Sequence, residues 1–242
     1  MEDYIIDPFS LEWIITNLIT LISILIVIHI GKNILDNNDN KIKLGYIVGA
    51  ILLARFFTSH LYQVYGVPFR WNLMESLPLQ LCSISAIISS ISLFRFNQFF
   101  YEFLILLGLP AAIISLITPE LTMGYSPFLL VEYFISHGGI VLSALYLTFV
   151  LGARPRIGSW IKITIASQVV LLLAHSMNLW LNKLYPDASA VANYMYTIIP
   201  PQVDLPLLVW DNYYYIGFEI FGFLFIMFSY FFFTRDKLNK VI

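Results

Sequence analysis

The sequence predicts an all-α integral membrane protein, a bundle of seven transmembrane helices forming a single domain over residues 1–242. Two observations carry this prediction. The chain is 59% hydrophobic, and only 12% of its residues are charged, whereas soluble domains carry roughly 25%. A soluble fold of this length has too little interior for so much apolar surface, so the surrounding solvent is lipid. At about 20 residues per span, seven spans use most of the chain.

Apolar runs and the residues that break them set the bounds of each predicted span. Residues 1–12 contain acidic residues and no Lys or Arg, unlike the basic start of a signal peptide, so we interpret the first apolar run as a retained span. Pro78 suits the first turn of the third span. Gly108 and Pro110 predict a kink or local opening of the fourth. The predicted spans are residues 11–30, 44–64, 77–94, 97–118, 128–151, 158–181 and 212–233.

The distribution of Lys and Arg predicts the orientation, because cytoplasmic loops of membrane proteins carry the excess of these residues. One side of the predicted bundle has only Arg70 and Lys183. The N-terminus therefore lies outside and the C-terminus in the cytoplasm. The opposite, cytoplasmic side has Lys32, Lys41, Lys43, Arg95, Arg154, Arg156, Lys162, Arg235, Lys237 and Lys240.

The sequence also argues against several classes of function. No basic tail or patch indicates nucleic acid. Cys82 is the only cysteine, so an intrachain disulfide is impossible. No HExxH or CxxC spacing occurs, and the histidines fall on separate helices, so we expect neither a metal site nor a cofactor. The oligomeric state is not predicted.

Polar side chains inside the predicted spans are the main functional signal, because such groups are costly in lipid and usually face the bundle interior. With a rise of 1.5 Å per residue, Cys82 would lie about 7 Å and His137 about 14 Å below the outer ends of their helices. The other groups also gather in the outer half, which predicts one cavity opening outward or into the outer leaflet. The candidates are Arg55, His60, Gln80, Cys82, Glu132, His137, His175, Asn178 and Glu219.

A purely structural interpretation stands beside the functional one. Polar side chains in membrane helices most often form hydrogen bonds between helices, and a lone cysteine is usually a small buried hydrophobe. Arg55 could form a structural ion pair with Glu132 or with Glu219. A neutral imidazole still needs two partners, so three histidines in one half of the membrane favour a site.

Three segments resemble a known family: ESLPLQLCSISAI (residues 75–87), FISHGGIVLSALYL (134–147) and NYMY (Asn193–Tyr196) followed by Pro200. They resemble the YwaF-type bacterial integral membrane proteins. That family is distantly similar to the eukaryotic transmembrane protein 164 group, phospholipid acyltransferases thought to use an embedded Cys and His. The resemblance implies a multi-pass protein of the bacterial plasma membrane.

The resemblance also implies roles for individual residues. Cys82 would be the nucleophile and His137 the base, acting on a membrane lipid, either a phospholipid or another acyl donor. Gln80 stands where the bacterial family commonly has a histidine, which departs from its pattern. His175 is the competing base, and Gln80 or Asn178 could donate to an oxyanion.

The leading hypothesis is therefore a membrane-embedded enzyme that transfers or hydrolyses acyl groups through a Cys82 thioester, with His137 as general base. One rival is a proton- or solute-coupled transporter using Arg55, Glu132 and Glu219. The other is a non-catalytic membrane protein that binds a lipid or a partner. The residues expected to support the site are Gln80, His175, Asn178, Arg55, His60, Glu132, Glu219 and Asn193.

Overall fold

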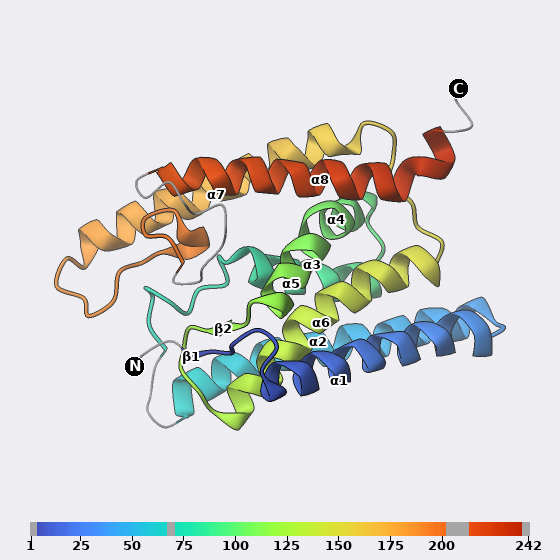
Figure 1. The fold of residues 1–242 in the computed structure, drawn as a ribbon, viewed down its shortest axis with the longest axis horizontal. Helices are drawn as coiled ribbons and strands as arrows, with labels where there is room; N and C mark the ends of the chain where they lie inside the picture. Colours follow the sequence, from blue (N-terminus) through green and yellow to red (C-terminus); the bar gives the residue numbers. More distant parts are fainter. Residues whose placement is uncertain (1–3, 67–70, 202–212, 239–242) are drawn as a thin grey trace.

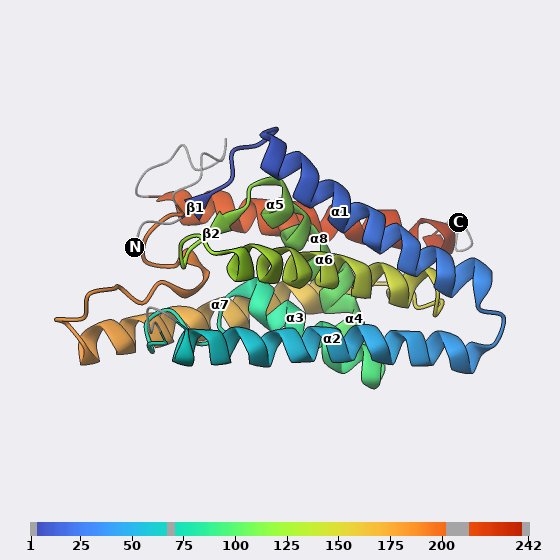
Figure 2. The same cartoon turned by 90° about the horizontal axis from the view of Figure 1, so that it is seen from below.

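The computed structural model describes residues 4–66, 71–201 and 213–238, and its helices run roughly along one long axis (Figures 1 and 2). Two short strands, β1 (Tyr4–Ile5) and β2 (Glu120–Leu121), pair antiparallel at one end of the bundle. The helices are α1 (Leu11–His29), η1 (Ile30–Ile34), α2 (Asn38–Tyr65), α3 (Leu81–Phe94), α4 (Gln98–Phe103), η2 (Leu104–Gly108), α5 (Leu109–Ile117), α6 (Pro127–Phe149), α7 (Ser159–Leu184), η3 (Tyr194–Tyr196) and α8 (Tyr214–Leu238).

Six helical segments in the described part of the chain are long and apolar enough to cross a membrane, judged by length and composition. Their bounds confirm a multi-pass helical membrane protein. A further apolar helix, α3, has only 14 residues. The six segments are Leu11–Ile34, Asn38–Tyr65, Gln98–Ile117, Pro127–Phe149, Ser159–Leu184 and Tyr214–Arg235.

Helices at the centre of the bundle differ sharply in burial from those at its edge. The apolar window of Gln98–Ile117 is 61% buried and that of α6 is 56% buried, against 11% for α1 and for α7. Helix α6 packs on α1, α2, α3 and α5 and is therefore the central helix of the bundle. The exposed faces of α1 and α7 are rows of Ile and Leu. Such faces are stable in a hydrocarbon solvent and costly in water.

The fourth predicted span opens locally at the expected place. Helices α4 and α5 are joined by η2, a π-helical turn over Leu104–Gly108 whose residues are all buried. Pro110 has no N–H to donate to the carbonyl four residues earlier, so a regular α-helix cannot continue unchanged through this position. The prediction from Gly108 and Pro110 is confirmed.

The third predicted span starts later than expected. The prediction placed its first residue at Leu77, with Pro78 in the first turn, but α3 begins at Leu81 after the extended residue Gln80. The amide of Leu77 donates instead to the hydroxyl of Tyr194, at 3.0 Å. Residues 77–80 thus precede the helix, and their first residue contacts Tyr194. Helix α3 rises only about 21 Å, less than a hydrocarbon core of about 30 Å.

Other bounds shift by a few residues. Helix α2 begins at Asn38 and not near residue 44, because the side chain of Asn37 caps it by accepting from the amide of Asp39. Helix α1 continues through η1 beyond the predicted end at residue 30. The predicted start of the last span, residue 212, lies outside the described residues.

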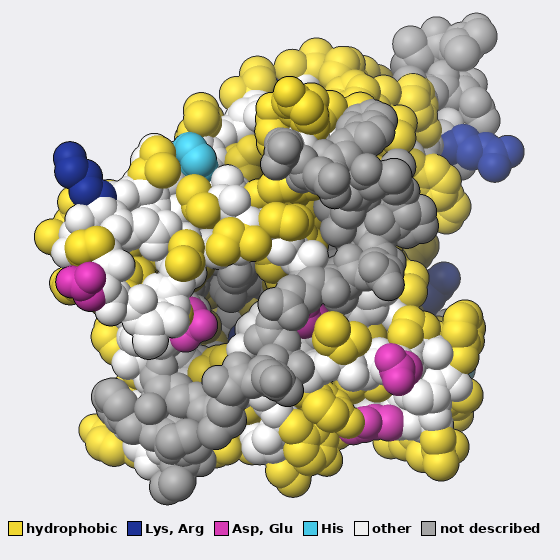
Figure 3. All heavy atoms as spheres, turned by 60° about the vertical axis from the view of Figure 1, so that its left-hand side comes forward, with side chains coloured by type: hydrophobic (Ala, Val, Ile, Leu, Met, Phe, Trp, Pro, Cys, Tyr) yellow, Lys and Arg dark blue, Asp and Glu magenta, His cyan; other side chains and the backbone are white. Residues whose placement is uncertain are grey.

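The two ends of the bundle differ in charge. Helices α2, α5 and α7 end, and α1, α3, α6 and α8 begin, at the end that carries β1 and β2. Figure 3 looks onto this end, where several acidic side chains lie among hydrophobic and uncharged polar atoms. Among the described residues, this end has one lysine, Lys183, in the last turn of α7. The opposite end carries Lys32, Lys41, Lys43, Arg95, Arg154, Arg156, Lys162 and Arg235.

Candidate functional site

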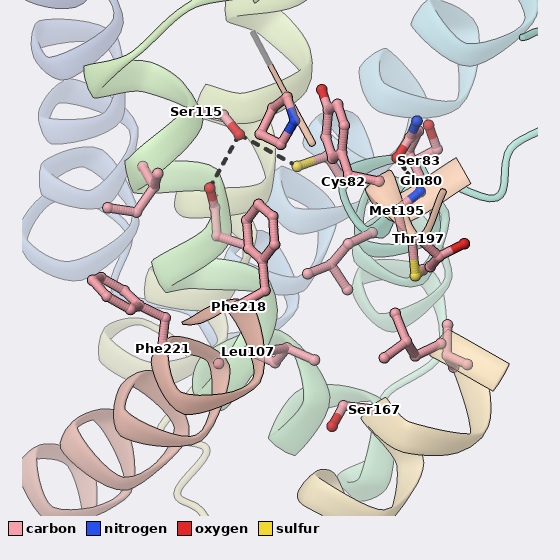
Figure 4. Close-up of a pocket in the computed structure, with 18 of the residues that line it drawn as sticks. Gln80, Cys82, Ser83, Leu107, Ser115, Ser167, Met195, Thr197, Phe218 and Phe221 are labelled. Carbon is pink, nitrogen blue, oxygen red and sulfur yellow. Dashed lines mark hydrogen bonds between the residues drawn. The ribbon is translucent and has the colours of Figure 1, made fainter. Parts of the chain in front are cut away.

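A cavity of about 870 Å³ lies between the α7–α8 pair and the helices α3, α5 and α6. Figure 4 shows part of its wall, with Cys82 and Ser115 facing each other and Phe218 and Phe221 of α8 on another side. A cavity is thus present, as predicted, and most of the predicted polar residues line it. Those residues are Arg55, Gln80, Cys82, Glu132, His137, His175 and Glu219.

Cys82 of α3 and His137 of α6 both line the cavity. Both helices run away from the end that carries β1 and β2. Cys82 is the second residue of α3, and His137 is the eleventh residue of α6. The offset in depth between the two side chains stays a prediction from the sequence.

Three contacts connect Cys82 with His137 through α5 and α6. The sulfur of Cys82 lies 3.5 Å from the hydroxyl oxygen of Ser115 on α5. The hydroxyl of Tyr133 on α6 donates to the carbonyl oxygen of Ser115 at 2.7 Å. The ring of Tyr133 packs on the imidazole of His137, with ring centroids 4.1 Å apart. The nucleophile candidate and the base candidate are therefore held by one continuous group of side chains.

His137 has one ring nitrogen available toward the cavity. Its side chain is 8% exposed, and its Nδ1 lies 2.9 Å from the carbonyl oxygen of Tyr133. A carbonyl only accepts, so the proton of the neutral ring is assigned to Nδ1. Nε2 is then an acceptor, and no hydrogen bond to it occurs within the described part of the chain. Cys82 likewise makes no hydrogen bond to a histidine among these residues; its contact is with Ser115.

Arg55 of α2 and Glu132 of α6 form an ion pair in the cavity wall. Their side chains are only 16% and 12% exposed. The Nε of Arg55 is buried and has no hydrogen-bond partner among the described residues. Arg55 also interacts electrostatically with Cys82 and with His137. The pair therefore lies beside the reactive candidates and leaves one donor unused.

The first turn of α3 faces the cavity without a side-chain cap. Gln80 is the N-cap residue but makes no capping hydrogen bond, and Leu81, Cys82 and Ser83 all line the cavity. The first amides of a helix have no partner inside the helix. They also carry the positive end of the helix dipole. This end of the cavity is thus suited to a developing negative charge.

A second polar group comes from α7 and α8. The amide of Gln168 donates to the carboxylate of Glu219 at 2.5 Å, and both side chains line the cavity. His175 lines it from the same helix as Gln168. Among the described residues His175 makes no hydrogen bond to Cys82, whereas His137 is connected to Cys82 through Tyr133 and Ser115.

Three predicted site residues lie outside the cavity wall. His60 is bonded through Nδ1 to the carbonyl of Phe56, at 2.9 Å, and packs on its ring. Asn178 is fully buried and binds the backbone of Tyr194 through both of its amide atoms. Asn193 folds its own loop by accepting from the amides of Ile198 and Ile199. These side chains use their hydrogen bonds to hold structure.

Gln80 both stabilises the local structure and lines the cavity. Its Oε1 accepts from the amide of Met195 at 2.8 Å and so holds η3. Its side chain also lines the cavity, and Figure 4 shows Gln80 next to Met195 and Ser83. The two protons of the Asn178 amide go to the carbonyl oxygen of Tyr194 and to the hydroxyl of Thr197, which leaves none for the oxyanion role expected of Asn178. The Nε2 of Gln80 has no partner among the described residues.

Ser115 and Tyr133 were missed by sequence reasoning. Ser115 is one serine in an apolar helix, a position where hydrogen bonding back to the helix is common, and it gives no signal of its own. Tyr133 could have been found, because it precedes His137 by four residues and therefore shares its helix face. The described residues contain no group of three His, Cys, Asp or Glu side chains that could hold a metal ion.

The fold and the cavity define a class: a multi-pass helical membrane protein with an internal, largely apolar cavity that carries a thiol and an imidazole on its wall. The model of the TMEM164 family matches residues 8–230, so the chain belongs to the TMEM164 family. No curated protein matches the chain, and no solved structure matches it.

Proposed function

We propose that this protein is a membrane-embedded lipid enzyme that transfers or hydrolyses acyl groups through a thioester on Cys82, with His137 as general base. The observation that carries the proposal is the cavity of about 870 Å³ with Cys82 and His137 on its wall, connected through Ser115 and Tyr133. Membership of the TMEM164 family is compatible with a lipid-related function. The proposed substrate is a phospholipid or another membrane acyl donor.

The proposed reaction has two balanced steps. His137 Nε2 takes the proton of the Cys82 thiol, and the sulfur attacks the carbonyl carbon of an acyl ester. A C–S bond forms, the ester C–O bond breaks, and the leaving alkoxide receives the proton from His137. A hydroxyl acceptor or water then attacks the thioester, returning the acyl group to oxygen and the proton to Cys82.

Groups near Cys82 fit the charge that such a reaction develops. The uncapped amides of Cys82 and Ser83, together with the Nε2 of Gln80, would donate to the oxyanion of the tetrahedral intermediate. Arg55 would offset the negative charge of the intermediate. In the resting protein Glu132 neutralises the positive charge of Arg55. The apolar wall formed by Leu107, Phe218 and Phe221 (Figure 4) would hold the acyl chain.

The membrane placement belongs to the same proposal. We infer that α3 is the seventh span, shortened because residues 77–80 are not helical. Gln80 lines the cavity, and membranes tolerate non-helical backbone beside a cavity. The end rich in Lys and Arg faces the cytoplasm, which puts the N-terminus outside. The proposed relation to YwaF-type proteins of the bacterial plasma membrane is supported by the segments 75–87, 134–147 and 193–196.

Turnover of labelled phospholipid by the purified protein in vesicles tests the proposal. We expect Cys82→Ser and His137→Ala to lose at least about a hundredfold in rate. His60→Ala is the matched control, since His60 makes the same bond to its own helix but lies outside the cavity. Wild-type turnover in both Cys82→Ser and His137→Ala would refute the mechanism. Solute uptake that depends on Glu219, without lipid turnover, would favour a transporter instead.

A further inference from the structure

The hydrogen bonding of Ser115 determines which partner of the Cys82–Ser115 contact is the donor. The Ser115 hydroxyl lies 3.1 Å from the carbonyl oxygen of Ala111 and 3.5 Å from the sulfur of Cys82. A hydroxyl has one proton and two lone pairs. The Ala111 carbonyl can only accept, so the hydroxyl proton goes to it. The remaining bond must then run from the Cys82 thiol to the oxygen of Ser115.

We infer that Ser115 is the positioning residue of Cys82: its hydroxyl accepts a hydrogen bond from the resting thiol and reverses to donate to the sulfur once Cys82 is deprotonated. The first half concerns the resting protein alone. The second half rests on the proposed function, because it needs a base to remove the thiol proton.

The reversal requires only rotation of one hydroxyl. When the thiol proton moves to Nε2 of His137, the sulfur becomes an acceptor without a proton. Rotation of the Ser115 hydroxyl then breaks its bond to Ala111 and forms a bond to the sulfur. The Ala111 carbonyl keeps a hydrogen-bond partner after the rotation, because in an α-helix it accepts from the backbone amide of Ser115. No proton is gained or lost by Ser115, and the new bond is of the stronger, charge-assisted kind.

Tyr133 keeps the oxygen of Ser115 in place. Its hydroxyl donates to the Ser115 carbonyl at 2.7 Å, and its ring packs on His137. The same side chain therefore positions both the partner of the thiol and the proposed base. His137 supplies an independent sign that the wall accommodates a reacting group, because it is more than nine-tenths buried and its Nε2 has no partner within the described ranges.

The charged and titratable groups named here around the thiol come from three elements. Arg55 of α2 and Glu132 of α6 neutralise one another. Tyr133 and His137 face the cavity from α6, and Tyr196 faces it from η3. The hydrogen-bond partner of the Cys82 sulfur within the described chain is Ser115 and none of these groups.

The single cysteine makes the resting half of the inference directly measurable. The full chain in lipid nanodiscs has one S–H stretching band in the infrared spectrum. We expect this band at the lower frequency of a hydrogen-bonded thiol in the wild type and in Ser115→Thr, and at the higher, free-thiol frequency in Ser115→Ala. Ser167→Ala is the matched control, because Ser167 also lines the cavity but bonds to Thr164 of its own helix.

Two results would overturn this half. One is a wild-type band at the free-thiol frequency, which decides the question even if Ser115→Ala does not fold. The other is an unchanged band in Ser115→Ala.

The reversing half is tested by alkylation of Cys82 with a small neutral maleimide at neutral pH. We expect Ser115→Ala to react about five- to tenfold more slowly than the wild type, as for loss of one hydrogen bond. Ser115→Thr should restore the rate, and Ser167→Ala should not alter it. Equal rates in all four proteins would overturn the reversal. Absence of lipid turnover would refute the proposed function while leaving the infrared result to decide the contact.

Discussion

Two ion pairs, one in the cavity wall and one outside it, differ in how completely their hydrogen bonds are used. Glu102 is fully buried and receives the backbone amide and two guanidinium nitrogens of Arg156 as well as the amide of Gln98. Glu132 pairs with Arg55, whose Nε is left without a partner among the described residues. The two pairs have the same chemistry, but only the second contains a buried donor without a partner in the described part of the chain.

Two histidines differ in position and not in hydrogen bonding. His60 and His137 each bond through Nδ1 to the carbonyl four residues earlier, at 2.9 Å. Of these two, only His137 lines the cavity. A buried polar group without a partner costs free energy, so the Nε of Arg55, without a partner among the described residues, favours a binding site in the same wall.

The largest expected difference is between the two histidines. His137→Ala should lower lipid turnover by about 10²- to 10⁴-fold, the usual contribution of a general base, while His60→Ala should stay within about twofold of the wild type. Initial rates on labelled phospholipid at saturating substrate measure the comparison. Equal losses in the two variants would remove the distinction between cavity and scaffold.

The two glutamates should separate stability from activity. Glu102→Gln weakens a saturated set of bonds to a charged group, so it should lower the free energy of unfolding by about 2 kcal/mol. Glu132→Gln should destabilise the protein less and impair turnover more. Denaturation of both variants in the same detergent, followed by rate assays on the folded fraction, provides the check. The reverse pattern would place the functional pair at Glu102.

Gly222 tests whether the apolar part of the cavity holds the acyl chain. A Cβ at this position would meet nothing within 4 Å, and Gly222 lines the cavity. Gly222→Leu should therefore fit without strain and lower kcat/KM for long-chain lipids about tenfold relative to short-chain ones, the scale on which pockets discriminate methylene groups. Gly222→Ala should have a smaller effect. A uniform loss for all chain lengths would locate the chain elsewhere.

The smallest expected effect concerns Tyr194, which holds the segment before α3. Its hydroxyl donates to the carbonyl of Leu73 and accepts from the amide of Leu77. Burial raises the pKa of Tyr194 from 10.0 to about 12. The folded state thus favours the protonated form, so its stabilisation is complete below pH 10 and is lost as the pH rises from 10 to 12. Tyr194→Phe should lack this part of the alkaline loss in a series of thermal unfolding curves, and an unchanged series would contradict it.

The sequence was sufficient for what depends on local pattern. Apolar length identified the six long segments, and Gly108 with Pro110 located the opening at η2. The resemblance and the cost of polar groups in lipid selected Cys82 and His137 before their surroundings were known. These features need only the residues themselves and their neighbours along the chain.

What failed depended on contacts between distant segments. The start of α3 was predicted four residues too early, and the segment before it contacts Tyr194, more than a hundred residues away. Asn178 looked like a site residue, yet the backbone of Tyr194 occupies its amide. Ser115 was missed because its importance comes from facing Cys82 on another helix. A single sequence shows which side chains are costly, but not which partners offset that cost.

The central claim is that Cys82 becomes acylated, and one measurement tests it most directly. The protein is incubated with vesicles of dioleoyl phosphatidylethanolamine and phosphatidylglycerol, quenched in acid, and digested for mass spectrometry of the peptide that contains the single cysteine. We expect one oleoyl group on Cys82, removed by neutral hydroxylamine, and no such adduct in His137→Ala. Lipid turnover by the wild type without any adduct, continuing in Cys82→Ala, would contradict it.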